Sequence, residues 1–217
     1  MDFELARFNM VEQQIRTWEV LDQRVLDLLF KVRREDFVPP QYRELAFADL
    51  EIPLGHGEKM LQPKIEGRML QELAPTETDR ILEVGTGSGY MTALLAALAA
   101  HVYSVEIIPD FSRSAAERLA AHGVRNVTLD IGDAARGWDK HGPYDAIVLT
   151  GSVPLLSESF KQSLATGGRL LAVVGEPPVM EAQLITNAGG GAYNSIALFE
   201  TCIASLRNAP RPERFVF

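Results

Sequence analysis

The sequence predicts an α/β fold: a doubly wound, mostly parallel, seven-stranded sheet with an N-terminal helical cap and a C-terminal antiparallel hairpin. From Arg80 onward, short apolar strands alternate with helical segments, which is typical of a parallel sheet covered by helices on both faces. Before residue 75 the apolar residues follow helical spacing. We expect one domain, with a cap and substrate-side loop at 1–75, a core at 76–206 and a tail at 207–217.

The cap contains three predicted helices. Apolar residues recur at helical spacing in 8–18 and in 25–32, where Asp22 is suited to an N-cap. A loop at 55–57 precedes a third helix, which Pro63 opens because proline fits the first turn of a helix. These segments predict a helical layer that covers part of the sheet.

In the core, strands and helices are expected to alternate and then give way to a hairpin. Gly167-Gly168 is expected to form a turn before the last parallel strand. The hairpin strands, 182–186 and 196–203, flank three consecutive glycines at 189–191. The other expected strands are 81–84, 102–105, 127–131, 146–149 and 170–174, and the expected helices are 90–99, 109–122 and 155–164.

Composition narrows the class of protein. A net charge of -8 argues against nucleic acid as a partner, because such binders need a clustered basic face. The longest apolar run, Met91 to Ala100, is too short to span a bilayer, and the opening residues lack a secretory signal. Cys202 is the only cysteine and the four histidines are scattered, so we expect no metal site. The composition predicts a cytoplasmic protein of undetermined oligomeric state.

The most informative stretch runs from Arg80 to Tyr90. A buried strand leads into Gly85-Thr-Gly-Ser-Gly89, a helix follows, and the next strand ends on Glu106. In a parallel sheet this places a glycine turn and a carboxylate side by side at the carboxyl ends of neighbouring strands, where nucleoside cofactors bind.

The details favour S-adenosylmethionine over a dinucleotide. The dinucleotide pattern G-x-G-x-x-G is not met, because the third glycine here is displaced. Glu83 would repel a pyrophosphate but suits an ammonium and a sulfonium group. Alternatively, Glu83 or Asp133 could be a helix cap or a surface acid. Glu106 can accept from both ribose hydroxyls, and Asp133 from the adenine amine. The predicted cofactor-binding residues are Glu83, Gly85, Thr86, Gly87, Ser88, Glu106, Ile107, Gly132, Asp133 and Ala134.

Over almost its whole length the chain resembles protein-L-isoaspartate O-methyltransferases. The resemblance implies a Rossmann-like methyltransferase fold and methylation of the free α-carboxylate of isoaspartyl residues in damaged proteins. Its N-terminal segments are more specific than the glycine motif, which alone indicates only a class I methyltransferase. The matching segments are Met10-Val-Glu-Gln-Gln-Ile-Arg16, Arg24-Val-Leu26, Asp36-Phe-Val-Pro39, Leu54-Gly-His-Gly57, 80–90, Val102-Tyr-Ser-Val-Glu106, Gly132-Asp133, Tyr144-Asp-Ala-Ile-Val148 and Gly167-Gly-Arg-Leu170.

The substrate-side motifs depart from the family pattern. A Thr-Ile-Ser-x-Pro type motif is replaced by Lys59-Met-Leu-Gln-Pro63, so Leu61 stands where the family has its serine and is not expected to act chemically. Lys59 could supply a cation to a carboxylate or be a solvated surface lysine. The family's Val-Arg-Phe-Val-Pro-Leu type stretch is replaced by 201–206, and Arg214-Phe-Val-Phe217 is either a shifted substitute or packs elsewhere.

Three functions follow from this pattern. The first is methylation of an isoaspartyl carboxylate, which is ionised at neutral pH (reference pKa ~4) and needs no general base. The second is methylation of another acceptor, a small-molecule carboxylate or other oxygen nucleophile, with His56 as the candidate base for an alcohol. The third is a non-catalytic S-adenosylmethionine-binding protein.

Overall fold

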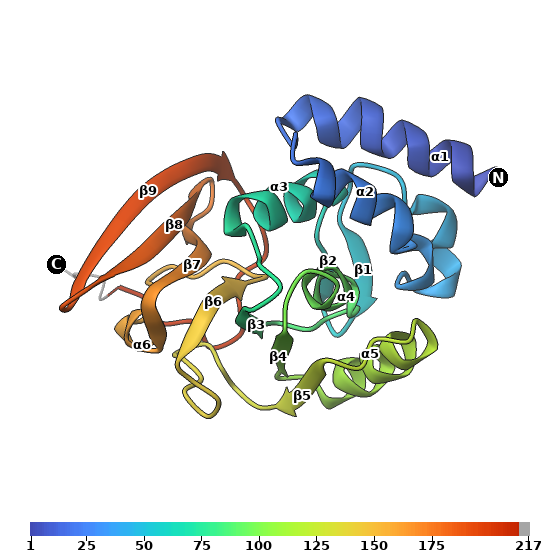
Figure 1. Cartoon of the computed structure of the whole chain (residues 1–217). Helices are drawn as coiled ribbons and strands as arrows, with labels where there is room; N and C mark the ends of the chain where they lie inside the picture. The colour runs from blue at the N-terminus through green and yellow to red at the C-terminus, as the bar shows by residue number, and fades with distance from the viewer. Residues whose placement is uncertain (213–217) are drawn as a thin grey trace, which may run out of the picture.

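A seven-stranded sheet forms the centre of the computed structural model, which describes residues 1–212 (Figure 1). The strand order is β5-β4-β3-β6-β7-β8-β9, with β3 to β7 parallel and the β8–β9 hairpin antiparallel at one edge. This confirms the predicted α/β class and its C-terminal hairpin. The strands are β3 (Arg80–Val84), β4 (His101–Glu106), β5 (Val127–Ile131), β6 (Tyr144–Leu149), β7 (Leu164–Glu176), β8 (Val179–Gly189) and β9 (Ala192–Thr201).

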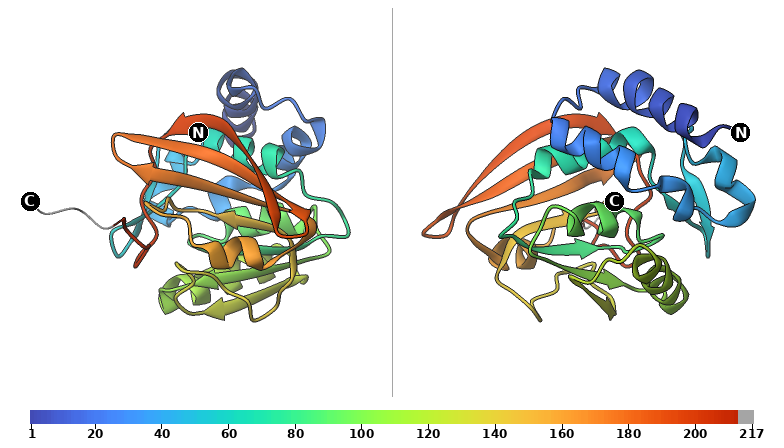
Figure 2. Two further views of the ribbon diagram at one scale, coloured as in Figure 1. Left: turned by 90° about the vertical axis from the view of Figure 1, so that its left-hand side faces the viewer. Right: turned by 45° about the vertical axis from the view of Figure 1, so that its right-hand side comes forward.

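Alternation along the strands produces two apolar layers. Ile81 packs with the cap and with helices α3 (Pro63–Leu73), α4 (Tyr90–Ala96) and α5 (Pro109–Ala121). Leu82 and Val84 point to the opposite face, where Phe160 of α6 (Glu158–Gln162) joins a second cluster. The first cluster is continuous from the cap into the sheet, and Figure 2 shows the N-terminal helices lying over this side.

The cap contains the expected helices with additional short turns. Helix α1 (Phe3–Asn9) continues into a π-helical segment (Met10–Ile15) and a 3-10 turn (Arg16–Trp18), and α2 spans Gln23–Lys31. The Asp22 side chain accepts a hydrogen bond from the Arg24 amide at 2.9 Å, which confirms the predicted N-cap. Two further 3-10 segments follow, Arg34–Asp36 and Pro40–Leu45.

The segment predicted as a loop at 55–57 is the turn of a small antiparallel hairpin. Its strands are β1 (Ile52–Gly55) and β2 (Glu58–Met60). Gly55, His56 and Gly57 all have positive φ, of 104°, 52° and 84°. Two glycines make this tight turn accessible, because only glycine adopts such angles at little cost. The hairpin projects from the cap toward the carboxyl ends of β3 and β4 (Figure 1).

Several core boundaries differ from the prediction: β7, β8 and β9 begin earlier than expected, and α4 and α6 are shorter. The helix expected at 155–164 is limited to Glu158–Gln162, because Leu164 already pairs with Tyr144 as the start of β7. Gly168 lies inside β7, at an irregular part of its register with β6, instead of in a turn before a strand. A Cβ at position 168 would lie 2.8 Å from the Ala165 carbonyl oxygen, so close backbone packing requires glycine here. This glycine interrupts the apolar residues of the strand, which is why the strand was predicted to begin later.

Residues 1–212 contain no helix that is both long and apolar enough to cross a membrane. Within the same range, no group of three or more histidine, cysteine, aspartate or glutamate side chains is arranged to hold a metal ion. The predicted C-terminal substitute, Arg214-Phe-Val-Phe217, lies outside the described residues.

Candidate active site

A cleft of about 740 Å³, a volume that includes the open solvent at its mouth, lies at the carboxyl ends of β3 and β4. Strand β3 lies between β4 and β6, so the chain leaves it in one direction toward β5 and later returns on its other side. This is the switch point at which open α/β sheets bind ligands. The cleft walls come from the glycine turn, the ends of β4 and β5, the β1–β2 hairpin and the segment 204–207.

The glycine turn is held by the two neighbouring strands. Gly85 has φ 98°, and a Cβ there would lie 2.3 Å from Thr150 Oγ1. The Thr150 hydroxyl, just beyond β6, donates to the Gly85 carbonyl oxygen at 2.7 Å. The Gly87 amide donates to Glu106 Oε2 at 2.8 Å. Thr150 was not predicted as a site residue, although its place directly after a predicted strand was a usable signal.

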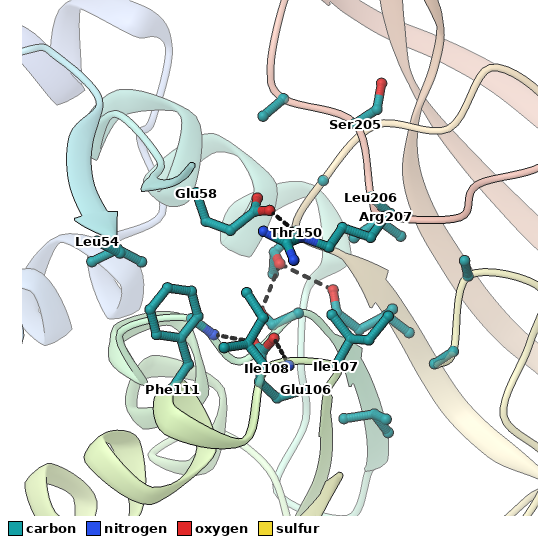
Figure 3. A pocket seen from close by; sticks show the side chains of 18 of the residues that line it. Leu54, Glu58, Glu106, Ile107, Ile108, Phe111, Thr150, Ser205, Leu206 and Arg207 are labelled. Atoms are coloured by element: carbon teal, nitrogen blue, oxygen red, sulfur yellow. Dashed lines mark hydrogen bonds and ion pairs between the residues drawn. The ribbon is translucent and has the colours of Figure 1, made fainter. Parts of the chain in front are cut away.

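Glu106 lies at the centre of the cleft and is almost fully buried (Figure 3). Its Oε1 accepts from the Ile108 amide at 2.9 Å, while Oε2 accepts from Gly87. Each carboxylate oxygen has two acceptor positions, so each keeps one for a ligand. Two backbone amides therefore orient the carboxylate toward the cleft.

Glu83 does not face the cleft, which corrects the role predicted for it. Its strand position places it on the face covered by α4, where Oε2 accepts from Thr92 (2.5 Å) and Ser104 (2.6 Å). Thr86 in turn donates to Ser104, so this buried hydroxyl chain anchors the glycine turn from below. Burial raises the pKa of Glu83 to about 8, which leaves it largely uncharged at neutral pH.

The residues predicted after β4 and β5 all line the cleft. Ile107, Gly132 and Ala134 form part of its wall beside Asp133. Asp133 Oδ1 accepts from the Ala135 amide at 3.1 Å, and Oδ2 accepts from Asn208 Nδ2 at 2.8 Å. The Asn208 contact comes from the segment predicted to be a tail.

Leu61 and Lys59 line both the main cleft and a smaller adjoining cavity of about 320 Å³. The Leu61 side chain is buried, with 8% of the residue exposed. Lys59 Nζ pairs with Glu51 Oε2 at 2.7 Å, and this hydrogen bond raises the pKa of the lysine. Thr86 and Ser88 lie on the smaller cavity.

His56 is not positioned as a base in the cleft. Its side chain is half-exposed on the hairpin turn and does not line either cavity. Nε2 lies 3.3 Å from Asp110 Oδ2, and the ring packs edge-on against Phe111. The turn directs the imidazole to α5. The position of His56 next to the segment 59–63 in the sequence therefore did not indicate that its side chain enters the cleft.

The segment after β9 closes the cleft from the opposite side. The Ser152 amide donates to the Ala204 carbonyl, and the Leu206 amide donates to the Ser152 carbonyl, each at 2.9 Å. Arg207 Nε donates to Glu58 Oε1 at 2.6 Å and its Nη2 reaches the His56 carbonyl, as Figure 3 shows for the Glu58 pair. Sequence reasoning assigned Arg207 to the tail and missed this contact.

A protein-family model described as protein-L-isoaspartate(D-aspartate) O-methyltransferase matches residues 6–198. The chain belongs to this family. A protein-L-isoaspartate O-methyltransferase of Methanoculleus marisnigri is 44% identical over 169 residues, covering 78% of this chain and 77% of the relative. A Synechococcus protein of the same name is 37% identical over 215 residues, covering 99% and 85%. The protein is accordingly an S-adenosylmethionine-dependent O-methyltransferase.

Solved structures agree with this fold. A Plasmodium falciparum protein-L-isoaspartate O-methyltransferase in complex with S-adenosyl-L-homocysteine superposes with a TM-score of 0.79 at 21% identity, covering 95% of this chain and 99% of that chain. Another protein-L-isoaspartate O-methyltransferase has the same TM-score at 22% identity, covering 92% of this chain and 65% of that longer chain. At these identities the likeness establishes the family's fold.

Proposed function

We propose that this O-methyltransferase methylates the free α-carboxylate of isoaspartyl residues in damaged proteins or peptides. The observation that carries the proposal is that the main cleft, within residues 1–212, offers no unpartnered carboxylate as a base. Its four carboxylates are all engaged: Glu51 and Glu58 by ion pairs, and Glu106 and Asp133 by hydrogen bonds. An acceptor that is already ionised needs none. The proposed location is the cytoplasm, which cell fractionation tests.

The cleft residues fit S-adenosylmethionine as the methyl donor. Glu106 keeps one acceptor position on each oxygen for the two ribose hydroxyls, and Asp133 keeps acceptor capacity for the adenine amine. Ile107 and Ala134 supply apolar surface beside them. When bound, the cofactor supplies an electrophilic methyl group on a sulfonium.

The chain's own residues would orient the acceptor and exclude water. Lys59 and Arg207 place cations on two sides of the cleft, where they attract a carboxylate although each is already paired. Leu61 and Leu54 present alkyl surface on the same cleft, which would desolvate the attacking oxygen. Alignment and desolvation are therefore the main contributions of the protein to the reaction.

The test uses the purified protein, methyl-labelled S-adenosylmethionine, and an isoaspartyl peptide beside its normal aspartyl counterpart. Base-labile label on the isoaspartyl peptide alone is the expected result. Cofactor binding without transfer to either peptide would reject the proposal. That result would favour another acceptor, a small carboxylate or other oxygen nucleophile. The hydrocarbon side chain of Leu61, at the position of the family serine, also points to this alternative.

Leu61→Ser tests whether the missing hydroxyl limits the reaction. A hydrogen bond to a charged group contributes about 1.5–3 kcal/mol, so kcat/KM for the isoaspartyl peptide should rise at least about tenfold. Leu54→Ser is the matched control, since it introduces the same hydroxyl on the same cleft away from the family position. Equal kcat/KM values for Leu61→Ser and the parent protein would show that the absence of a hydroxyl at position 61 does not limit methylation of the isoaspartyl peptide.

A further inference from the structure

The smaller cavity beside the glycine turn contains an acid that no sequence motif identifies. It is lined by residues 85–88 of the turn and shares Lys59, Leu61 and Thr150 with the main cleft. The two spaces are thus neighbouring parts of one site. Among the described residues that line the smaller cavity, Glu66 is the only acid.

One carboxylate oxygen of Glu66 is held in an ion pair, and the other is available to a ligand. It lies in the first turn of α3 with 3% of the residue exposed, and its Oε2 pairs with Arg34 Nη1. Within residues 1–212, Glu66 Oε1 has no hydrogen-bond partner. Oε1 keeps some accessible surface, because it is not one of the fully buried polar atoms that lack a partner, and Glu66 lines the smaller cavity. A carboxylate oxygen in this position can accept a hydrogen bond from a ligand.

Arg34 fixes the position of this carboxylate relative to the cavity wall. It is 1% exposed and also donates to the Ala46 carbonyl at 2.9 Å and the Leu61 carbonyl at 2.6 Å. The guanidinium lies over the Tyr90 ring, with 5.1 Å between its central carbon and the ring centroid. All these groups belong to different elements, so Glu66 cannot turn toward solvent without breaking the network.

The shape of the site determines which part of the cofactor meets Glu66. Glu106 and Asp133 lie on the main cleft and suit the ribose and adenine, so the methionine portion of a bound cofactor would reach past the glycine turn into the smaller cavity. That portion carries an α-ammonium group. Glu83, to which the sequence assigned this group, is buried under the turn and lines neither cavity.

We propose that Glu66 binds the α-ammonium group of S-adenosylmethionine through Oε1, with Arg34 as its positioning residue. An ammonium group paired with a desolvated carboxylate forms a short charge-assisted hydrogen bond. Lys59 also lines this cavity, but the ion pair that it forms is with Glu51 Oε2, at 2.7 Å. The inference rests on the cofactor and not on the identity of the acceptor.

Calorimetry on Glu66→Gln with three ligands tests the proposal. S-adenosylhomocysteine and its decarboxylated analogue both carry the ammonium group, whereas 5′-methylthioadenosine lacks the amino-acid portion. We expect the first two to bind at least tenfold more weakly to the variant, and the third to change less than twofold. Equal weakening of all three ligands, or unchanged binding of S-adenosylhomocysteine, would overturn the proposal.

Two further variants keep the test decisive. The double variant Arg34→Met/Glu66→Met removes the buried pair together, which is often tolerated because no unpaired charge remains, and it should show the same ligand selectivity. Glu83→Gln should not distinguish the three ligands, and a selective loss there would assign the ammonium to Glu83 instead. These are binding measurements, so failure of isoaspartyl methylation would leave their outcome unaffected.

Discussion

Glu106→Gln separates the structural role of this carboxylate from its role in binding. Glutamine has one acceptor oxygen, so it cannot accept from both the Gly87 and Ile108 amides, which lie 2.8 and 2.9 Å from the two glutamate oxygens. One buried amide loses its partner in both the free and the bound protein. The free energy of unfolding should therefore fall by about 1–3 kcal/mol, with no effect on affinity from this contact.

The affinity change comes from the two ribose hydroxyls proposed to contact Glu106. Hydrogen bonds to charged groups contribute about 1.5–3 kcal/mol, and neutral ones about 0.5–1.5 kcal/mol, so each bond loses about 1 kcal/mol. One hydroxyl still donates to the glutamine oxygen, while the other faces the NH2 group and must accept from it instead of donating. With both bonds weakened in this way the loss is about 2 kcal/mol, and S-adenosylhomocysteine should bind about 30-fold more weakly. Calorimetry measures this affinity, and urea unfolding measures the stability.

Asp145→Asn is the matched control. Asp145 Oδ2 accepts from the Arg80 amide at 2.8 Å, and neither residue lines the main cleft. The same acid-to-amide change should lower stability there without altering cofactor affinity. If Glu106→Gln lowers stability but binds S-adenosylhomocysteine within twofold of the parent protein, Glu106 does not contact the ribose.

Two further predictions concern Glu83, which lies below the glycine turn, and Arg207, which closes the cleft against the β1–β2 hairpin. Glu83 has a folded-state pKa of about 8 against an ordinary value of 4.5, so the unfolded chain ionises first and stability falls as pH rises through this window. Glu83→Gln should remove that loss, of about 1.4 kcal/mol per pH unit, in urea unfolding at several pH values. Parallel stability profiles for the variant and the parent protein would contradict the assignment. Arg207→Ala removes both contacts between Arg207 and the β1–β2 hairpin. It should speed S-adenosylhomocysteine release about three- to tenfold in stopped-flow measurements. Glu58→Gln keeps the contact of Arg207 with the His56 carbonyl and should have a smaller effect. Unchanged release in Arg207→Ala would show that this pair does not restrict the cleft.

The predictable parts of this protein depend on local pattern. The strands around Gly85 and Glu106 were correctly placed because apolar runs and glycines specify them within a few residues. The cleft-lining positions after β4 and β5 followed from the geometry of parallel strands. Glu83 was placed at the correct strand position but given the wrong role, because the hydroxyls that bury it, on Thr92 and Ser104, carry no motif.

The unpredicted parts depend on contacts between distant segments. Arg34 and Glu66 are 32 residues apart, and each looks like an ordinary surface charge in its own helical segment. Arg207 and Glu58 are separated by 149 residues. Such pairs have no periodic signal, and a single sequence does not indicate which charges will be buried together.

The wall formed by 204–207 has a consequence for the order of events during synthesis. The ribosome makes the glycine turn more than a hundred residues before it reaches Arg207, yet both belong to the same cleft. Chains emerge at about 5–20 residues per second, so the cleft stays open on one side for several seconds after the turn has left the ribosome. A nascent chain should therefore retain cofactor poorly until its C-terminal segment has joined Ser152, which limits methyl transfer to completed molecules.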